Sequence, residues 1–273
     1  HIQAPRAVNG DPVTDPVLLH GFLEGHLHDG SRGHVERNLG ATEADPAKVV
    51  VFLQGGGACF SAETCDPQND LYRTAVTEGP NPEGVFDFEN PRNPFADYSA
   101  VYVPYCTGDV HIGNATTEYA DGLTIQHKGY ANGTAALDHL AATFPDATDV
   151  VVLGESAGSI AAPLYAGLVA DRLPDAHITV VADGSGSYPD DPALNEIFAA
   201  WGTGDVVPAW FDPAGLSAPG LFVQSGRHDP DIVFARHDFA EDENQASWYP
   251  YLGIPVGDLP ARMEANEEQI EAA

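Results

Sequence analysis

Apolar, mostly β-branched runs alternate along the chain with polar and glycine-rich stretches, and five runs are typical of buried strands. They lie near residues 48–54, 99–105, 149–154, 177–182 and 220–225. Residues 131–144 carry apolar side chains at helical spacing, and a closing helix is expected over 258–273 with Asp258 as N-cap. Strands separated by helical or loop crossovers predict an α/β fold, with a mainly parallel sheet and helices on both faces.

The third run leads directly into Gly154-Glu155-Ser156-Ala157-Gly158 and then into a small, apolar, helix-compatible segment. A G-x-S-x-G sequence between a buried strand and a helix is the nucleophile elbow of α/β-hydrolases. Its turn exposes the serine hydroxyl at the carboxyl end of the sheet, above a helix N-terminus that favours negative charge. We therefore predict that Ser156 is a catalytic nucleophile. The alternative is an ordinary strand-to-helix turn with a serine N-cap.

A glycine-rich loop, Gln54-Gly55-Gly56-Gly57, follows the first run. Glycines directly after a strand let backbone N–H groups turn toward a ligand, and in α/β-hydrolases such a loop supplies half of the oxyanion hole. The N–H group after the nucleophile, that of Ala157, supplies the other half. A merely flexible loop is the alternative interpretation.

A serine nucleophile also needs a histidine base and an acid that orients it, and in this fold the acid follows the serine on a later strand. Asp229 lies at the end of the fifth run and is our first candidate for the acid. Asp183, at the end of the fourth run, is the second candidate, and Asp231 is the third. Asp109 and His111 are interpreted as parts of a structured loop near the pocket, because two residues cannot complete a metal site.

The 273 residues suit one α/β domain over 1–273, and no run approaches the ~18 apolar residues of a membrane span. The formal net charge is −30, from 11 basic and 41 acidic residues. Such a surface repels nucleic acid and anionic membranes. The acidic residues are spread along the whole chain, which favours adaptation to a salt-rich source over an unusually acidic mesophilic protein.

Three cysteines bear on the location of the protein. Cys59 and Cys65 are close enough in sequence to bridge across a short loop, which would favour an oxidising compartment, and Cys106 lies outside this pair. The first residues have neither the basic start nor the apolar core of a signal peptide, so the chain is either processed or cytosolic. Histidines 20, 26, 28 and 34 fit no standard ligand spacing, and we expect no metal and no cofactor.

Several uncommon motifs recur in series and resemble the signatures of the pectin acetylesterase family. They are Phe52–Phe60 with Glu63-Thr64-Cys65, Val103–Asn114, His127–Asn132, the elbow, and Ala182–Gly186. The resemblance covers roughly residues 26 to 273 and implies an extracellular serine carboxylesterase of α/β-hydrolase type. Such enzymes remove acyl groups, often acetyl groups on polysaccharide. The resemblance also implies roles for single residues: Ser156 as nucleophile, Asp229 as acid, Gly56, Gly57 and Ala157 as oxyanion donors, and Cys59–Cys65 as a disulfide.

The catalytic histidine of that family, in a loop after one more strand, has no counterpart in this sequence. His237 is the sole histidine after Asp229, and we expect it on the helix that follows the acid. The helix over 258–273 shows no C-cap signal and is expected to lead into a further strand. We therefore expect these residues to be part of a longer polypeptide, with the last strand and the histidine loop beyond residue 273. The rival expectation is that His237 or an upstream histidine serves as base.

Two functions remain open on the sequence. The first is a serine esterase that acts on a small acyl ester or an acetylated polysaccharide. The second is a non-catalytic binding protein on a hydrolase scaffold, which the absence of the family's histidine favours.

Overall fold

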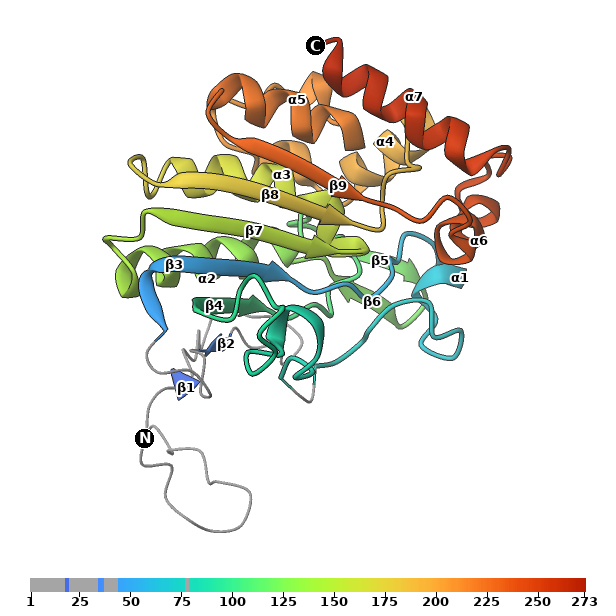
Figure 1. Cartoon of the computed structure of the whole chain (residues 1–273). Coiled ribbons are helices and arrows are strands. Elements are labelled where there is room, and N and C mark those ends of the chain that lie inside the picture. Colours follow the sequence, from blue (N-terminus) through green and yellow to red (C-terminus); the bar gives the residue numbers. More distant parts are fainter. Residues whose placement is uncertain (1–17, 20–33, 37–43, 77–78) are drawn as a thin grey trace.

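A twisted sheet runs through the centre of the molecule (Figure 1). The computed structural model describes residues 18–19, 34–36, 44–76 and 79–273. In this part the sheet has seven strands in the order β1-β2-β4-β3-β7-β8-β9. Their bounds are β1 Leu18–Leu19, β2 His34–Glu36, β3 Asp45–Leu53, β4 Tyr98–Val103, β7 Asp149–Glu155, β8 His177–Asp183 and β9 Val233–His237. The last five strands are parallel, whereas β1 and β2 are antiparallel at one edge.

The two faces of the sheet have different covers. On one face, α2 (Gly129–Thr143), α3 (Ala157–Ala170) and α5 (Ala218–His228) bury the larger apolar cluster. On the other face, the segment around the 3₁₀ turn η1 (Gly84–Phe86) packs aromatic side chains on Phe52 and Tyr102. The segment from η1 to β4 therefore covers part of this face of the sheet. The result is an α/β-hydrolase-like fold, as predicted.

Shorter elements complete the described chain. They are α1 Ala62–Cys65, β5 Thr116–Ala120, β6 Leu123–Gln126, α4 Pro192–Ala200, η2 Thr203–Asp205, η3 Pro213–Gly215, α6 Glu243–Leu252 and α7 Leu259–Glu271. The side chain of Asp258 accepts a hydrogen bond from the Ala261 N–H, so the predicted N-cap of the closing helix is confirmed. None of the helices in the described residues is both long and apolar enough to cross a bilayer.

One of the five predicted strands is wrong. Residues 220–225 lie within helix α5, and the next strand, β9, begins only at Val233. Helix α5 packs its Leu221 and Phe222 side chains into the core beside α3, so the apolar run is one face of a helix. The other four strands agree with the prediction to within a few residues.

Candidate active site

The chain turns sharply at Ser156, between the carboxyl end of β7 and the first residue of α3. Ser156 has φ 51° and ψ −115°, a conformation that residues with a side chain rarely adopt. Its N–H donates a 2.7 Å hydrogen bond to the Asp183 carbonyl on the neighbouring strand. A side chain at Gly154 would collide with Gly158, and one at Gly158 would collide with the Leu53 carbonyl. The two glycines of the motif are thus required by the close approach of strand and helix.

The glycine loop after β3 lies directly against this turn. A Cβ atom at Gly55 would be 3.0 Å from the Ser156 Cβ. Gly57 has φ 76°, in the left-handed region, and a side chain there would collide with the Leu71 carbonyl. Gly57, Ser156 and Ala157 line one hollow, and Gly56 lines an adjoining one with Gly57 and Ser156. The structure therefore brings together four of the residues that the sequence singles out.

The hollow beside Ala157 is apolar. It encloses roughly 480 Å³, its open mouth included. Its walls come from the loop after Gly57, from α3, α4 and α6, and from the segments between them. The side chains that line it include Phe60, Val110, Ile160, Leu194, Phe198, Trp201, Trp248 and Leu252. An apolar hydrocarbon group of a ligand would fit in this hollow when the carbon atom that bears the group lies beside the Ser156 side chain.

The adjoining hollow is more polar. Asp70, Arg73, Asn244 and Ser247 line it together with Trp248 and Tyr251, and Ser156 lies between it and the apolar hollow. Polar side chains mixed with aromatic rings can hydrogen-bond hydroxyl groups and cover the apolar face of a ring-shaped ligand. Ser156 therefore lies at the boundary between the apolar hollow and the polar hollow.

The prediction of Asp229 as the triad acid is wrong. Asp229 is the C-cap of α5, and its carboxylate accepts a hydrogen bond from the Asp231 N–H. Both residues precede β9, which runs parallel to β8 and β7, so they lie at the amino end of the sheet. Ser156 follows the carboxyl end of β7, at the opposite edge. The full length of the strands separates Asp229 from Ser156.

His237 also differs from expectation, because it is the last residue of β9 and is not helical. Its Nδ1 atom lies 2.9 Å from a carboxylate oxygen of Asp183, the residue opposite it on β8. This hydrogen bond raises the pKa of the half-exposed His237 ring above its usual value. Asp183 and His237 line a groove on the sheet face that Phe52 and Tyr102 occupy, whereas the apolar hollow lies on the α3 side. No described histidine ring forms a hydrogen bond with the Ser156 hydroxyl.

Two carboxylates that were not predicted from the sequence follow the carboxyl end of β9. Asp238 is largely buried and accepts hydrogen bonds from the Gly186 N–H and the Gln245 side chain. Asp242 caps helix α6, which supplies Trp248 to both hollows. The sequence does contain a signal for the correct assignment of these residues. Ser217 followed by Pro219 is typical of a helix start. A helix that begins there places the next strand later in the chain, at residues 233–237.

A buried polar turn, residues 105–111, packs against the glycine loop, where His111 Nε2 lies 2.8 Å from the Gln54 carbonyl oxygen. The Asp109 carboxylate accepts hydrogen bonds from the Thr107 hydroxyl at 2.6 Å and the Gly129 N–H at 2.7 Å. Burial raises the pKa of Asp109 to about 6 and lowers the pKa of His111 to about 4. His127, which hydrogen-bonds the Thr107 carbonyl through Nδ1, likewise has its pKa lowered to about 4 by burial. The interpretation of Asp109 and His111 as parts of a structured loop is therefore confirmed.

The expected disulfide between Cys59 and Cys65 is present and holds the segment after the glycine loop. Cys106 is a buried thiol. Among the residues that the structure describes, no three histidine, cysteine or acidic side chains gather as metal ligands would. Histidines 20, 26 and 28 lie outside the described residues, and the side chain of His34 is not described either.

The sequence is similar to palmitoleoyl-protein carboxylesterases over part of its length. It is 32% identical to the palmitoleoyl-protein carboxylesterase NOTUM of Schmidtea mediterranea over 125 residues, which are 41% of this chain and 22% of that protein. It is 28% identical to the human protein of that name over 136 residues, or 45% of this chain and 26% of that protein. An inactive palmitoleoyl-protein carboxylesterase, notum1b of Danio rerio, is 34% identical over 71 residues, or 24% of this chain and 51% of that protein.

These matches span only about a quarter of the two longer relatives. The family model for pectinacetylesterase matches residues 27–197, which is more than half of the chain and includes the glycine loop, the buried turn and the elbow. The chain therefore belongs to the pectinacetylesterase family.

Proposed function

We propose that this protein is a serine carboxylesterase that removes acyl groups through an acyl-enzyme on Ser156. The observation that carries the proposal is the strained turn at Ser156, which opens between two hollows and beside the glycine loop. A non-glycine residue held at positive φ costs about 1–3 kcal/mol, and such strain is found mainly where function requires it. The family membership and the carboxylesterase relatives support the same reaction class.

The chemistry follows from the groups around the turn. The Ser156 hydroxyl oxygen attacks the ester carbonyl carbon while a general base removes its proton, and the carbonyl oxygen becomes an oxyanion. The intermediate collapses to an acyl-Ser156 ester and releases the alcohol, which takes up the proton. Water then attacks the acyl-enzyme, releases the carboxylic acid and restores the serine.

The oxyanion donors in this proposal are the N–H groups of Gly56, Gly57 and Ala157. The Gly56 carbonyl accepts a 2.9 Å hydrogen bond from the Arg73 N–H. Because a trans peptide is planar, with its C=O and N–H in opposite directions, the Gly57 N–H is directed away from Arg73. Ala157 is the first residue of α3, where the N–H groups have no partner within the helix.

The general base of this proposal is an imidazole that lies outside the described residues, since no described ring reaches Ser156. Asp238 and Asp242, which follow the carboxyl end of β9, replace Asp229 as candidates for the acid. Both carboxylates accept hydrogen bonds from Gln245. Asp242 is the better placed of the two, because the helix that it caps lines the site.

The two hollows suggest which side of the ester lies where. The apolar hollow would hold the acyl group, and the polar hollow would hold the alcohol, such as a carbohydrate. Apolar side chains from three helices and the loops between them line the first hollow, so we propose that acyl chains longer than the acetyl group are accepted as well. The names of the relatives, palmitoleoyl-protein carboxylesterases, agree with a site for a longer chain.

Hydrolysis of p-nitrophenyl esters with acyl chains of two to eight carbons tests this function. We expect hydrolysis that is lost in Ser156→Ala, with kcat/KM rising from the two-carbon to the longer chains because about 0.8 kcal/mol is gained per buried CH₂. Added free imidazole should raise the rate if the base is missing from the protein used. Ser225→Ala, which changes a buried serine on α5, is the matched control and should keep the activity. Equal rates in the Ser156→Ala variant and the parent protein would exclude the nucleophile.

A non-catalytic binding protein is the second candidate. The lack of a described base at Ser156 favours it, and one relative carries the word inactive in its name. In this case a fatty acid or acyl ester would bind in the apolar hollow, measured by calorimetry, while no Ser156-dependent hydrolysis would occur with or without imidazole.

We further propose that the protein works in an oxidising, extracellular location, which the Cys59–Cys65 disulfide supports. Mass spectrometry of the protein alkylated without reductant should then find one modified cysteine after unfolding. Three modified cysteines would contradict both the disulfide and the location.

A further inference from the structure

The glycine loop is held at both ends by side chains of one buried segment, residues 105–111. The Tyr105 hydroxyl donates a 3.1 Å hydrogen bond to the Gly57 carbonyl. At the other end of the loop, the His111 Nε2 atom lies 2.8 Å from the Gln54 carbonyl, and the Tyr105 N–H donates to the Gln54 side chain. A carbonyl oxygen can only accept, so the ring nitrogen of His111 carries the proton.

The Tyr105 and His111 rings support each other in the core. Their centroids are 4.6 Å apart, and each residue is only 1% exposed. Burial raises the pKa of Tyr105 and lowers the pKa of His111 to about 4, so both groups stay neutral near pH 7. Each therefore keeps the N–H or O–H that its hydrogen bond to the loop requires.

The segment that carries these rings is itself strained and tightly anchored. Val110 and His111 have φ values of 45° and 63°, which residues with side chains rarely adopt. The Val110 N–H donates to the Tyr105 hydroxyl at 2.8 Å, and the Tyr165 hydroxyl donates to the His111 carbonyl at 2.8 Å. Strain of this kind persists only where the surroundings enforce it, and here it directs both rings at the glycine loop.

We propose that Tyr105 and His111 are positioning residues for the oxyanion hole. By fixing the Gln54 and Gly57 carbonyls, they set the planes of the peptides 54–55 and 57–58. These two peptides flank the ones that carry the Gly56 and Gly57 N–H groups, so the donors are held between two fixed ends of the loop. The inference rests on the proposed esterase function. Neither side chain touches the substrate, since both lie beneath the loop and outside the residues that line the two hollows.

Tyr105→Phe tests the hydroxyl alone, because phenylalanine keeps the ring. We expect kcat for a p-nitrophenyl ester to fall about 10- to 100-fold with KM within about twofold, since a lost oxyanion donor costs roughly 10²–10³ in kcat and a misaligned one less. Tyr249→Phe is the matched control: Tyr249 is also fully buried, and its hydroxyl donates to the Ser187 carbonyl away from the loop. The control should lose similar thermal stability but keep kcat.

The role of His111 is tested by two substitutions, one that removes the hydrogen-bond donor and one that replaces it. His111→Leu removes the donor to Gln54 and should lower kcat as Tyr105→Phe does. His111→Gln offers an amide N–H in its place and should recover part of that loss. Equal kcat in the leucine and glutamine variants would show that the hydrogen bond has no positioning role.

Backbone hydrogen exchange separates this inference from the esterase function. The amides of residues 55–58 should exchange faster in Tyr105→Phe than in Tyr249→Phe, whether or not the protein hydrolyses esters. If Ser156→Ala leaves the hydrolysis unchanged, the esterase function fails, and exchange alone decides whether the loop is held by Tyr105. Unchanged exchange together with unchanged kcat in Tyr105→Phe would overturn the inference.

Discussion

Two groups of titratable side chains near the carboxyl end of the sheet differ in burial and in their partners. In the turn that includes Asp109 and His111, both side chains are buried and bind mainly hydroxyl and backbone groups. In the row formed by Glu155, Asp183 and His237, the three residues lie opposite one another on β7, β8 and β9 and are partly exposed to water.

The pKa of a histidine ring shifts in opposite directions in these two places. Burial disfavours the charged form of His111, whereas the Asp183 carboxylate favours the charged form of His237. A neutral, buried group keeps one hydrogen-bond direction and can hold a loop in place. An exposed ion pair is screened by water and is worth little. The buried turn is therefore suited to positioning, and the exposed row is not.

The largest expected effect is the loss of the buried carboxylate. Asp109→Ala should lower the free energy of unfolding by about 3 kcal/mol, because it leaves the Thr107 hydroxyl and the Gly129 N–H without their partner. Asp183→Ala, the exposed counterpart, should cost less than about 1 kcal/mol. Urea denaturation of both variants measures the difference, and equal costs would contradict the contrast between the regions.

A pH titration of stability gives the next effect. His111 and His127 have pKa values of about 4 in the folded protein, below the ordinary 6.5, so their contribution to stability rises as pH rises from about 4 to 6.5. Asp109, raised from 3.8 to about 6, contributes stability that is lost as pH rises through 6. The contribution of the two histidines to the free energy of unfolding rises with pH, and that of the one aspartate falls. Together these three groups should make the protein more stable at pH 6.5 than at pH 4.5.

Two variants separate these opposing contributions. Relative to the parent protein, the rise of stability with pH should be smaller in His127→Gln and steeper in Asp109→Asn. Denaturant melts at three pH values between 4.5 and 6.5 supply the slopes. A steeper slope in His127→Gln would show that burial does not control this ring.

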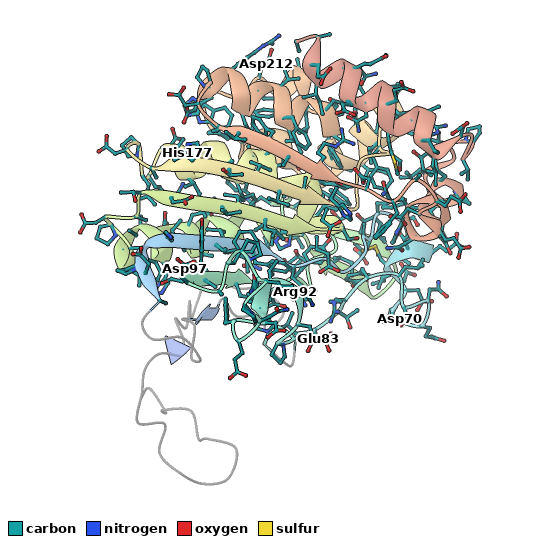
Figure 2. All side chains as sticks on the ribbon, in the orientation of Figure 1. Asp70, Glu83, Arg92, Asp97, His177 and Asp212 are labelled. Carbon is teal, nitrogen blue, oxygen red and sulfur yellow. A yellow bond between two sulfur atoms is a disulfide. The ribbon has the colours of Figure 1, made fainter. Side chains whose placement is uncertain are left out.

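Salt should act on the exposed region and hardly on the buried turn. The exposed acidic residues labelled in Figure 2, Asp70, Glu83, Asp97 and Asp212, lie at different places on the molecule, in keeping with a net charge of −30. Raising NaCl from about 0.1 M to 1 M shortens the Debye length to ~3 Å and should raise Tm by a few degrees. A flat or falling Tm would count against salt adaptation.

The smallest effect is expected at the exposed pair. His237→Gln should change the free energy of unfolding by less than about 0.5 kcal/mol at pH 7 and low salt. Because Asp183 raises the His237 pKa, any contribution is present below about pH 6.5 and lost as pH rises through the folded value. A loss as large as that of Asp109→Ala would show that this pair is structural after all.

Much of the site could be predicted from local patterns. The strand before Ser156, the turn and the helix after it follow one another in sequence, and the glycines that permit the turn stand beside the serine. Strand β8 and the glycine loop are equally local, as is the disulfide across a six-residue separation. These features depend on neighbours in the chain, which a sequence displays directly.

Asp229 was misplaced because an apolar run alone does not distinguish a strand from one face of a helix. Leu221 and Phe222 are buried against the core while Val223 and Gln224 are less so, a pattern that becomes clear only once α5 packs beside α3. This one difference moves Asp229 to the far edge of the sheet.

The sequence by itself determined the turn at Ser156, the glycine loop and the strands that carry them, because short-range backbone sterics and the burial of apolar runs decide these elements. The tertiary structure alone decided that Tyr105 and His111 hold the glycine loop from 48 and 57 residues away, and which edge of the sheet each carboxylate faces. The direction of a strand and the partner of a buried hydrogen bond are set by packing between distant segments, and no local pattern records them.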